Sequence, residues 1–185
     1  MTSKGSLIDR PLPRLRKYSK GDYSPGRGRI TIVAWVVLQA LFFSSWLPGS
    51  FHRRWLLRFF GATVGTGVVI KPRARVKFPW RLEVGDFSWI GEAVWIDNLA
   101  EVSIGRNCCI SQNSYLCCGS HDWMAEDFRL VTKRITIEDG VWIGARAVLG
   151  PGIEIGQGSI VTLGSIVTKS VDDFTVFRSH LKAGV

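Results

Sequence analysis

Aliphatic residues recur at every sixth position through much of the chain. The longest unbroken run occupies six successive positions, which are Ile137, Ile143, Leu149, Ile155, Val161 and Val167. A period of six fits neither the 3.6-residue repeat of an amphipathic helix nor the two-residue alternation of a half-buried strand. Self-similarity at a fixed short period instead indicates a repeat architecture, in which each unit buries its apolar side against the next unit.

Earlier runs keep the same period in a shifted phase, and each break is a slip of two residues. These runs are Val64, Ile70, Val76 and Leu82; Val84, Ile90, Ile96 and Val102; and Ile104, Ile110 and Leu116. Three hexads form one coil with three flat sides, so every sixth aliphatic points into a triangular prism and stacks on its equivalent in the next coil. The pattern predicts an all-β fold, a parallel β-helix over residues 61–175, with a loop at 118–134 where the period stops.

Glycine often follows the periodic aliphatic directly. The set comprises Gly85, Gly91, Gly105, Gly144, Gly150 and Gly156. We expect these residues at the corners of the coil, where a Cβ would crowd a tight turn and where a positive φ is often needed.

The repeats resemble those of the hexapeptide-repeat acyltransferases. Within that family, residues 79–123, PWRLEVGDFSWIGEAVWIDNLAEVSIGRNCCISQNSYLCCGSHDW, are similar to the colanic-acid-type exopolysaccharide O-acetyltransferases, and the likeness runs from about Trp55 to Val176. Its most specific parts are the WIGE segment at 89–92 and the GSHD segment at 119–122. The resemblance implies a left-handed β-helix, an exception to the usual crossover handedness. It also implies acetyl-CoA as co-substrate and a homotrimer.

Basic charge belongs to the N-terminal part of the chain. Residues 1–82 contain 16 Lys/Arg and 2 Asp/Glu, net +14, whereas residues 83–185 contain 8 and 13, net −5. We interpret residues 1–29 as a basic N-terminal tail. Because the basic residues are not interleaved with a recognisable reading element, we expect no binding to nucleic acid.

An uncharged stretch, residues 30–47, follows this tail. As a helix it would be about 27 Å long, slightly short of a ~30 Å hydrocarbon core. Pro48-Gly49 breaks it, and residues 51–60 form an amphipathic pattern. We expect residues 30–60 to be membrane-proximal helices that bind an anionic membrane surface without crossing it. Since no signal-peptide cleavage pattern follows, the expected location is cytoplasmic, peripheral at the inner face of the plasma membrane. The open alternative is a helix pair packed against the β-helix or between subunits.

His121 is the candidate catalytic residue. The chain has three histidines; His52 lies in the arginine-rich amphipathic segment and His180 near the C-terminus, so His121 is the one inside the repeat region. A hydroxyl becomes a useful nucleophile only as its proton is removed, and imidazole suits that task near neutral pH. Its place in the GSHD segment resembles the catalytic histidine of the family. Adjacent side chains on extended backbone point apart, so Asp122 is not assigned as its orienting partner.

The resemblance also supplies candidate binding residues. Acetyl-CoA is expected along the C-terminal coils at Trp142, Ala145, Leu163, Thr168 and Lys169, and the acceptor is expected near Asp97 and Asn98. Two departures from the family pattern stand out. Leu163 replaces a smaller residue and narrows the expected pantetheine groove, and residues 176–185 form an unusual C-terminal tail.

The cysteines form two adjacent pairs, Cys108-Cys109 and Cys117-Cys118, without zinc-ligand spacing, so we expect no metal site. A zinc carbonic-anhydrase chemistry on the same fold would need three histidine ligands, of which the repeat region offers one. The sequence therefore favours an O-acetyltransferase that moves acetyl from acetyl-CoA to a sugar hydroxyl in exopolysaccharide or lipid-linked oligosaccharide biosynthesis. Two alternatives stay open: an acetyltransferase for a small soluble acceptor, and an inactive membrane-bound scaffold.

Overall fold

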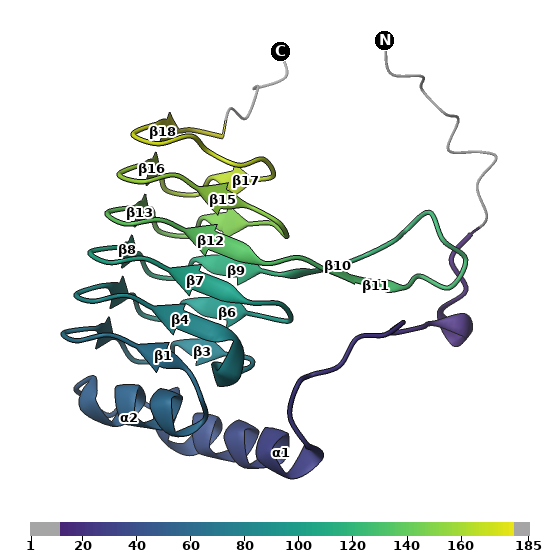
Figure 1. The fold of residues 1–185 in the computed structure, drawn as a ribbon, viewed down its shortest axis with the longest axis horizontal. Coiled ribbons are helices and arrows are strands. Elements are labelled where there is room, and N and C mark those ends of the chain that lie inside the picture. The colour runs from purple at the N-terminus through teal and green to yellow at the C-terminus, as the bar shows by residue number, and fades with distance from the viewer. Residues whose placement is uncertain (1–11, 180–185) are drawn as a thin grey trace.

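The computed structural model describes residues 12–179, which form a three-sided parallel β-helix closed at one end by helices (Figure 1). Face A contains β1 (Thr63–Val64), β4 (Leu82–Val84), β7 (Val102–Ile104), β12 (Ile135–Ile137) and β15 (Glu154–Ile155). Face B contains β2 (Val69–Ile70), β5 (Trp89–Ile90), β8 (Cys109–Ile110), β13 (Trp142–Ile143), β16 (Ile160–Val161) and β18 (Val176–Phe177). Face C contains β3 (Arg75–Val76), β6 (Trp95–Asp97), β9 (Tyr115–Cys117), β14 (Val148–Leu149) and β17 (Ile166–Val167).

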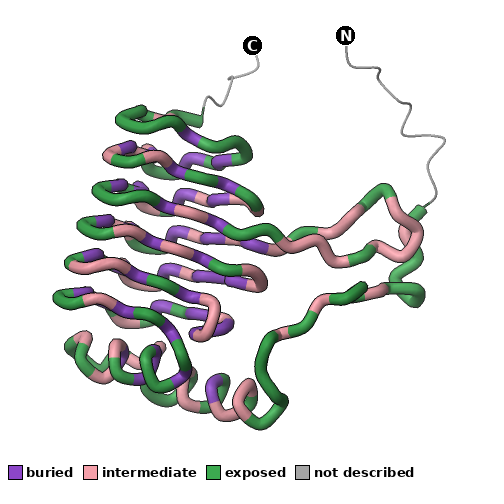
Figure 2. The backbone as a smooth tube through the Cα atoms, in the orientation of Figure 1, coloured by how far each residue is buried: buried purple, intermediate pink, exposed green. Residues whose placement is uncertain are grey.

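The periodic aliphatics stack in register along the inside of each face. On face A, for example, Val84 pairs with both Val64 and Ile104, and Ile137 pairs with Ile104 and Ile155. The periodic residues from Val64 to Val167 are all buried, which gives the interior stripe visible in Figure 2. The predicted parallel β-helix is confirmed, because each coil buries the apolar side of its neighbours.

The two-residue slips lie at the corner between face C and face A. The first of them falls at the 3₁₀ turn η4 (Pro79–Arg81), which leads directly into β4. The same corner holds the long excursion at residues 118–134, between the end of β9 and the start of β12. Insertions therefore gather at one edge of the prism and leave the stacked aliphatics undisturbed.

The glycine expectation is half right. A Cβ on Gly85 would lie 2.6 Å from the carbonyl carbon of Gly105, and one on Gly144 would lie 2.5 Å from the amide of Leu163, so these positions exclude a side chain. Positive φ occurs two residues later, at Phe87 (φ 58°) and Arg146 (φ 58°). Glycine is required directly after the aliphatic because the next coil approaches closely there. The left-handed turn is made two residues later, by residues such as Phe87 and Arg146.

The N-terminal helices cap the open end of the β-helix. We call residues 29–60 the cap; it comprises α1 (Arg29–Leu38), a π-helical turn η3 (Gln39–Phe43) and α2 (Phe51–Phe59). Trp35 donates from its indole to the carbonyl of Val76 at 2.8 Å, and the amide of Val76 donates to Gln39 Oε1 at 2.7 Å. Trp35, Phe43 and Leu57 are fully buried in the same cluster as the stacked aliphatics. The cap therefore satisfies backbone groups that the first coil would otherwise leave unpaired.

The apolar stretch 30–47 is therefore not one continuous α-helix, and the expected membrane contact of residues 30–60 stays a prediction. Helix α1 ends at Leu38, and its inner side chains pack on the first coil, as the open alternative described. In the described part of the chain, none of the helices combines the length and the apolar character that a membrane crossing requires. At the other end, β18 pairs with β16, so Val176 and Phe177 belong to the last coil and not to the tail.

Candidate active site

His121 lies on a hairpin that leaves the β-helix at the corner between faces C and A. Strands β10 (Gly119–His121) and β11 (Leu130–Thr132) pair antiparallel, with His121 opposite Leu130. The hairpin projects sideways from the middle of the stack (Figure 1). The base candidate therefore stands away from the prism wall, at the edge where insertions are tolerated.

The imidazole of His121 is held from both sides. Its Nδ1 lies 3.0 Å from the carbonyl oxygen of Phe128, and its ring stacks on the Phe128 ring with centroids 4.4 Å apart and planes 7° from parallel. The Tyr18 ring approaches edge-on at 5.8 Å. Since a carbonyl can only accept a hydrogen bond, Nδ1 carries the proton in the neutral ring, and the Nε2 lone pair is left to accept one.

Phe128 contacts the candidate base, and the sequence did not reveal this contact. Its φ of 45° lies in the left-handed region, which is uncommon for a bulky residue, and its amide donates to the carbonyl of Ala125 at 3.1 Å. This turn aims the Phe128 carbonyl at His121. Backbone strain of this kind persists where the surrounding structure enforces it.

The acidic residues near His121 have other partners. Asp122 lies 3.5 Å from Arg129 Nε and accepts a hydrogen bond from the amide of Met124 at 3.1 Å. Glu126 accepts a hydrogen bond from Lys17 at 3.0 Å, and this bond, followed by the charges of Lys17 and Arg14, lowers the pKa of the Glu126 carboxyl. A backbone carbonyl, and not a carboxylate, orients the imidazole.

Part of the basic tail lies against the hairpin. We call residues 12–28 the strap; it includes the short 3₁₀ helix η2 (Leu15–Lys17). Its backbone exchanges hydrogen bonds with the hairpin, from Arg14 N to the Glu126 carbonyl at 2.8 Å and from Leu130 N to the Ser19 carbonyl at 3.2 Å. The strap thus braces the hairpin and brings Tyr18 to His121, a contact that no local sequence pattern signals.

The two acceptor candidates have different surroundings. Asn98 is fully buried. Its Oδ1 accepts a hydrogen bond from the Phe78 amide, and its Nδ2 donates to the carbonyls of Phe78 and Arg81. Its predicted contact with the acceptor is therefore wrong; Asn98 holds the η4 turn in place. Asp97 is also mostly buried, with Lys77 Nζ at 2.8 Å and the Tyr115 hydroxyl at 3.1 Å. Its backbone carbonyl accepts from Cys118 N, at the root of the hairpin.

The acetyl-CoA candidates lie on two different edges of the prism. Ala145 and Leu163 occupy the corner between faces B and C in successive coils, where the amide of Gly164 donates to the Ala145 carbonyl at 2.8 Å. Trp142 projects from face B beside them, half exposed, and donates from its indole to Ser111 Oγ at 2.9 Å. Thr168 and Lys169 follow β17, at the corner that also carries the hairpin. Within one protomer, face C separates His121 from the Ala145 corner.

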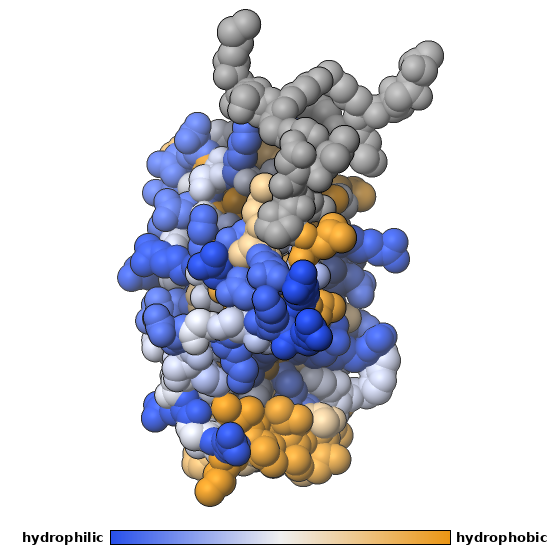
Figure 3. All heavy atoms as spheres, turned by 90° about the vertical axis from the view of Figure 1, so that its right-hand side faces the viewer, coloured by the Kyte–Doolittle hydropathy of each residue, from blue (hydrophilic) through white to orange (hydrophobic). Residues whose placement is uncertain are grey.

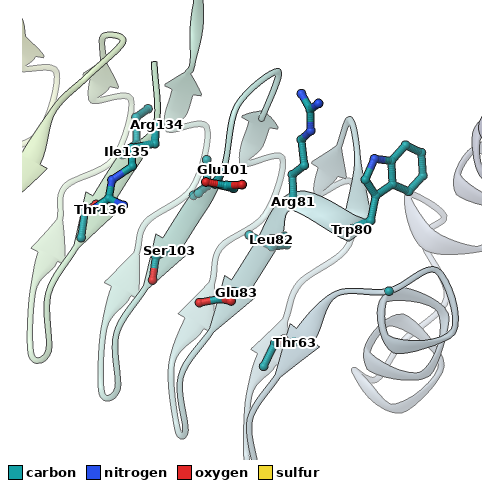
Figure 4. A pocket seen from close by; sticks show the side chains of 12 residues that line it. Thr63, Trp80, Arg81, Leu82, Glu83, Glu101, Ser103, Arg134, Ile135 and Thr136 are labelled. Carbon is teal, nitrogen blue, oxygen red and sulfur yellow. The ribbon is translucent and has the colours of Figure 1, made fainter. Parts of the chain in front are cut away.

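A polar groove runs along the outside of face A. It has a volume of about 480 Å³ and extends from Gly61, beside the cap, to Arg134 and Thr136, at the base of the hairpin. Thr63, Glu83, Ser103 and Thr136 project into it from successive strands, and Trp80 and Arg81 flank one end (Figure 4). Hydroxyl, carboxylate and guanidinium groups along one channel suit a ligand rich in hydroxyl groups.

Two of the four cysteines, Cys108 and Cys118, are buried in the core. Burial raises the pKa of the Cys108 thiol, and burial also raises the pKa of the Cys118 thiol, to about 12. All four thiols are free. Among residues 12–179, no three His, Cys, Asp or Glu side chains gather as a metal site.

Comparison with known proteins places the chain in a family. Residues 134–169 match the family described as "Bacterial transferase hexapeptide (six repeats)". The chain is 38% identical over 157 residues to the "Putative colanic acid biosynthesis acetyltransferase WcaF" of Escherichia coli (strain K12), across 84% of this chain and 86% of that protein. It is 30% identical over 122 residues to the galactoside O-acetyltransferase of the same strain, across 64% of this chain and 60% of that protein.

Two solved structures share the fold. A hexapeptide-repeat containing acetyltransferase of Vibrio cholerae O1 biovar eltor, complexed with acetyl coenzyme A, has a TM-score of 0.73 at 23% identity, over 85% of this chain and 88% of that chain. A galactoside acetyltransferase in complex with coenzyme A has a TM-score of 0.68 at 25% identity, over 78% and 74%. With a relative of this identity and coverage on the same coiled fold, the chain belongs to the hexapeptide-repeat acetyltransferases.

Proposed function

We propose that this protein is an O-acetyltransferase that moves acetyl from acetyl-CoA to a sugar hydroxyl in exopolysaccharide or lipid-linked oligosaccharide biosynthesis. The observation that carries the proposal is the 3.0 Å contact between His121 Nδ1 and the Phe128 carbonyl oxygen, from which we infer that Nδ1 holds the proton and Nε2 acts as the base. The relatives named above, which include a galactoside O-acetyltransferase, support the reaction class.

In the proposed reaction the His121 Nε2 removes the proton from the acceptor hydroxyl as the oxygen attacks the thioester carbonyl. The C–S bond then breaks, the acetyl ester forms on the sugar, and the proton held on Nε2 goes to the leaving CoA thiolate. The imidazolium formed during the attack keeps its Nδ1–H on the Phe128 carbonyl, which accepts more strongly from a charged donor. No covalent intermediate on the protein is needed.

The proposed acetyl-CoA groove combines two protomers. Trp142, Ala145 and Leu163 lie one face away from His121, so a single coil stack does not bring the two groups together. The outer side of face B is apolar, with Val69, Trp89, Cys109, Trp142, Ile160 and Val176 in a continuous row. Packing of this face in a homotrimer would bring a second hairpin toward the Ala145 corner, with Thr168 and Lys169 toward the nucleotide end.

The proposed acceptor site is the groove on face A, with Asp97 and Lys77 near the root of the hairpin. The groove begins at Gly61 beside the cap and ends at the coil that follows the hairpin. Three strand spacings of about 4.8 Å separate β1 from β12, so the groove spans about 14 Å. A saccharide entering at the cap would reach the His121 hairpin along it, which suits a lipid-linked acceptor at the inner face of the plasma membrane.

The test is acetyl transfer from acetyl-CoA to a panel of sugar acceptors by the native chain, by His121→Ala and by Asp122→Asn. We expect His121→Ala to lower kcat by about 10²- to 10⁴-fold while acetyl-CoA binding persists. Asp122→Asn is the matched control, because Asp122 pairs with Arg129 and not with the imidazole. Full transfer by His121→Ala would refute the assignment of the base. A native chain that neither binds nor turns over acetyl-CoA would favour the inactive scaffold.

A further inference from the structure

The outer side of the cap is apolar and exposed. Ile30 is 88% exposed, Trp46 69%, Phe51 76% and Phe59 68%, although inner residues of the same helices are buried. We call the exposed set the apolar base; its other members are Val33, Val36, Val37, Leu41, Phe42, Leu47 and Trp55. Figure 3 shows apolar side chains gathered at the cap end, below a largely polar middle. Such contiguous exposure marks a binding surface.

The apolar base is hollowed as well as exposed. A hollow of about 490 Å³ is lined by seven residues, of which His52 alone is polar. Trp55 and Phe59 stack at 5.3 Å along one side of it. The base is not required to close the core, since Trp35, Phe43 and Leu57 already do so. Its apolar surface is therefore available for contact with another molecule.

The residues that form the cap and the first coil carry basic side chains and no acidic ones. From Tyr23 to Leu82 the sequence contains ten Lys/Arg and no Asp or Glu. One of the ten, Arg53, is buried. Arg54 and Arg58 donate to the carbonyls of Val68 and Val64, which leaves their positive charge uncompensated. Arg73 lies over the Trp46 ring at 5.3 Å, at the edge of the apolar base, and its guanidinium also lies 4.0 Å from Glu92 Oε1.

We propose that the apolar base docks end-on to a lipid bilayer that carries anionic headgroups. Aromatic and aliphatic side chains enter the interfacial region, and the surrounding arginines meet the headgroup charge. A second copy of the chain is the less suitable occupant, because two bases placed together would oppose arginines such as Arg54 and Arg58, which donate to backbone carbonyls and not to carboxylates. This inference deepens the proposed function by naming the surface that would hold the enzyme beside a lipid-linked acceptor, although the docking itself does not depend on catalysis.

The test measures co-sedimentation of the full chain with vesicles of phosphatidylcholine alone and of phosphatidylcholine with about one third phosphatidylglycerol. We expect binding to the anionic vesicles, weakened by salt, and little binding to the neutral ones. The variant Phe51→Gln/Phe59→Gln should reduce binding at least about tenfold, since both side chains belong to the exposed base. Deleting the cap would be a poor test, because its inner side closes the core.

The matched control is Phe174→Gln, since Phe174 is 74% exposed but lies in the last coil, at the far end of the stack. It should bind vesicles as the native chain does. Acetyl-CoA binding is measured in parallel and should be unchanged in all variants, so a failure of docking is separable from a failure of the enzyme assignment. Absence of native binding, or equal binding by the double variant, would overturn the inference. The inference would also be overturned if the native protein formed a larger assembly in solution than the double variant does, because the surface would then bind a second copy.

Discussion

Arg53 is a buried cation whose loss should open the cap. The side chain is fully buried and donates to four backbone carbonyls of the segment that joins the two helices: Phe43 at 2.8 Å, Ser45 at 2.6 Å, Leu47 at 2.9 Å, and Gly49. A methionine keeps the apolar stem and removes every donor. Arg53→Met therefore leaves these acceptors without their partner.

The expected size follows from that count. A hydrogen bond from a charged donor contributes about 1.5–3 kcal/mol net, and a buried acceptor left unpaired costs about 1–3 kcal/mol. Ser45 and Leu47 are partly exposed and can take up water, so the full sum will not be realised. We expect Arg53→Met to lower the free energy of cap opening by about 3–5 kcal/mol.

Amide hydrogen exchange measures this opening locally. The amides of Ile70 and Val76 donate to Ser50 Oγ at 2.9 Å and to Gln39 Oε1 at 2.7 Å, so they are protected only while the cap is closed. A change of 3–5 kcal/mol should speed their exchange by about 10²- to 10³-fold or more, up to the limit set by global unfolding. The amide of Gly144, which donates to Val161 within the coils, should change far less.

The matched control is Arg54→Met, which removes a bond to the single carbonyl of Val68. Because this guanidinium is partly exposed and loses one bond, the variant should cost no more than about 1.5 kcal/mol. Exchange at Ile70 and Val76 that is equal in Arg53→Met and the native chain would show that the buried guanidinium does not hold the cap closed.

Two further predictions concern the coils. A Cβ on Gly105 would lie 2.7 Å from the amide nitrogen of Asp139, whereas a Cβ on Gly150 would meet nothing closer than 3.4 Å. Gly105→Ala should therefore lower the free energy of unfolding in urea by about 1–3 kcal/mol and Gly150→Ala by much less, and equal effects would contradict the close-approach explanation. Burial raises the pKa of Cys118 from 9.0 to about 12, so its neutral thiol contributes stability that is fully present below about pH 9 and is lost as the pH rises toward 12. Urea unfolding across that range should show a shallower decline for Cys118→Ala than for the native chain; parallel curves would argue against it.

The prediction of the coil succeeded because its cause is local. Each inward residue, such as Ile110 or Leu149, is placed by a six-residue period and then stacks on the equivalent residue of the next coil. The glycine pattern was predicted only in part. Sequence spacing showed that Gly105 and Gly144 accompany the inward aliphatic, but not that the turn with positive φ would fall two residues later, on side chains such as Arg146.

The candidate site was predicted less completely. His121 was predicted as the base from its place in the repeat region and its family-like segment, and the break in the period predicted a loop there. The antiparallel hairpin that this loop forms was not predicted. The supports of His121 were not predicted either, since Phe128 and Tyr18 reach the ring through a loop and a distant segment. The predicted acceptor contact of Asn98 was wrong because the sequence does not distinguish a corner residue that faces solvent from one that forms hydrogen bonds within a buried turn.

The sequence by itself determined the three-sided coil, the edge that carries the insertion and the histidine inside it, because a repeat buries its apolar side only against nearest neighbours. The tertiary structure decided what the N-terminal residues do. An apolar helix satisfies its side chains equally well in lipid or on protein, so hydropathy could not separate the inner Trp35, which caps the first coil, from the outer Ile30, which faces outward. The inner and outer sides of α1 become different only when the open end of the β-helix packs against one of them.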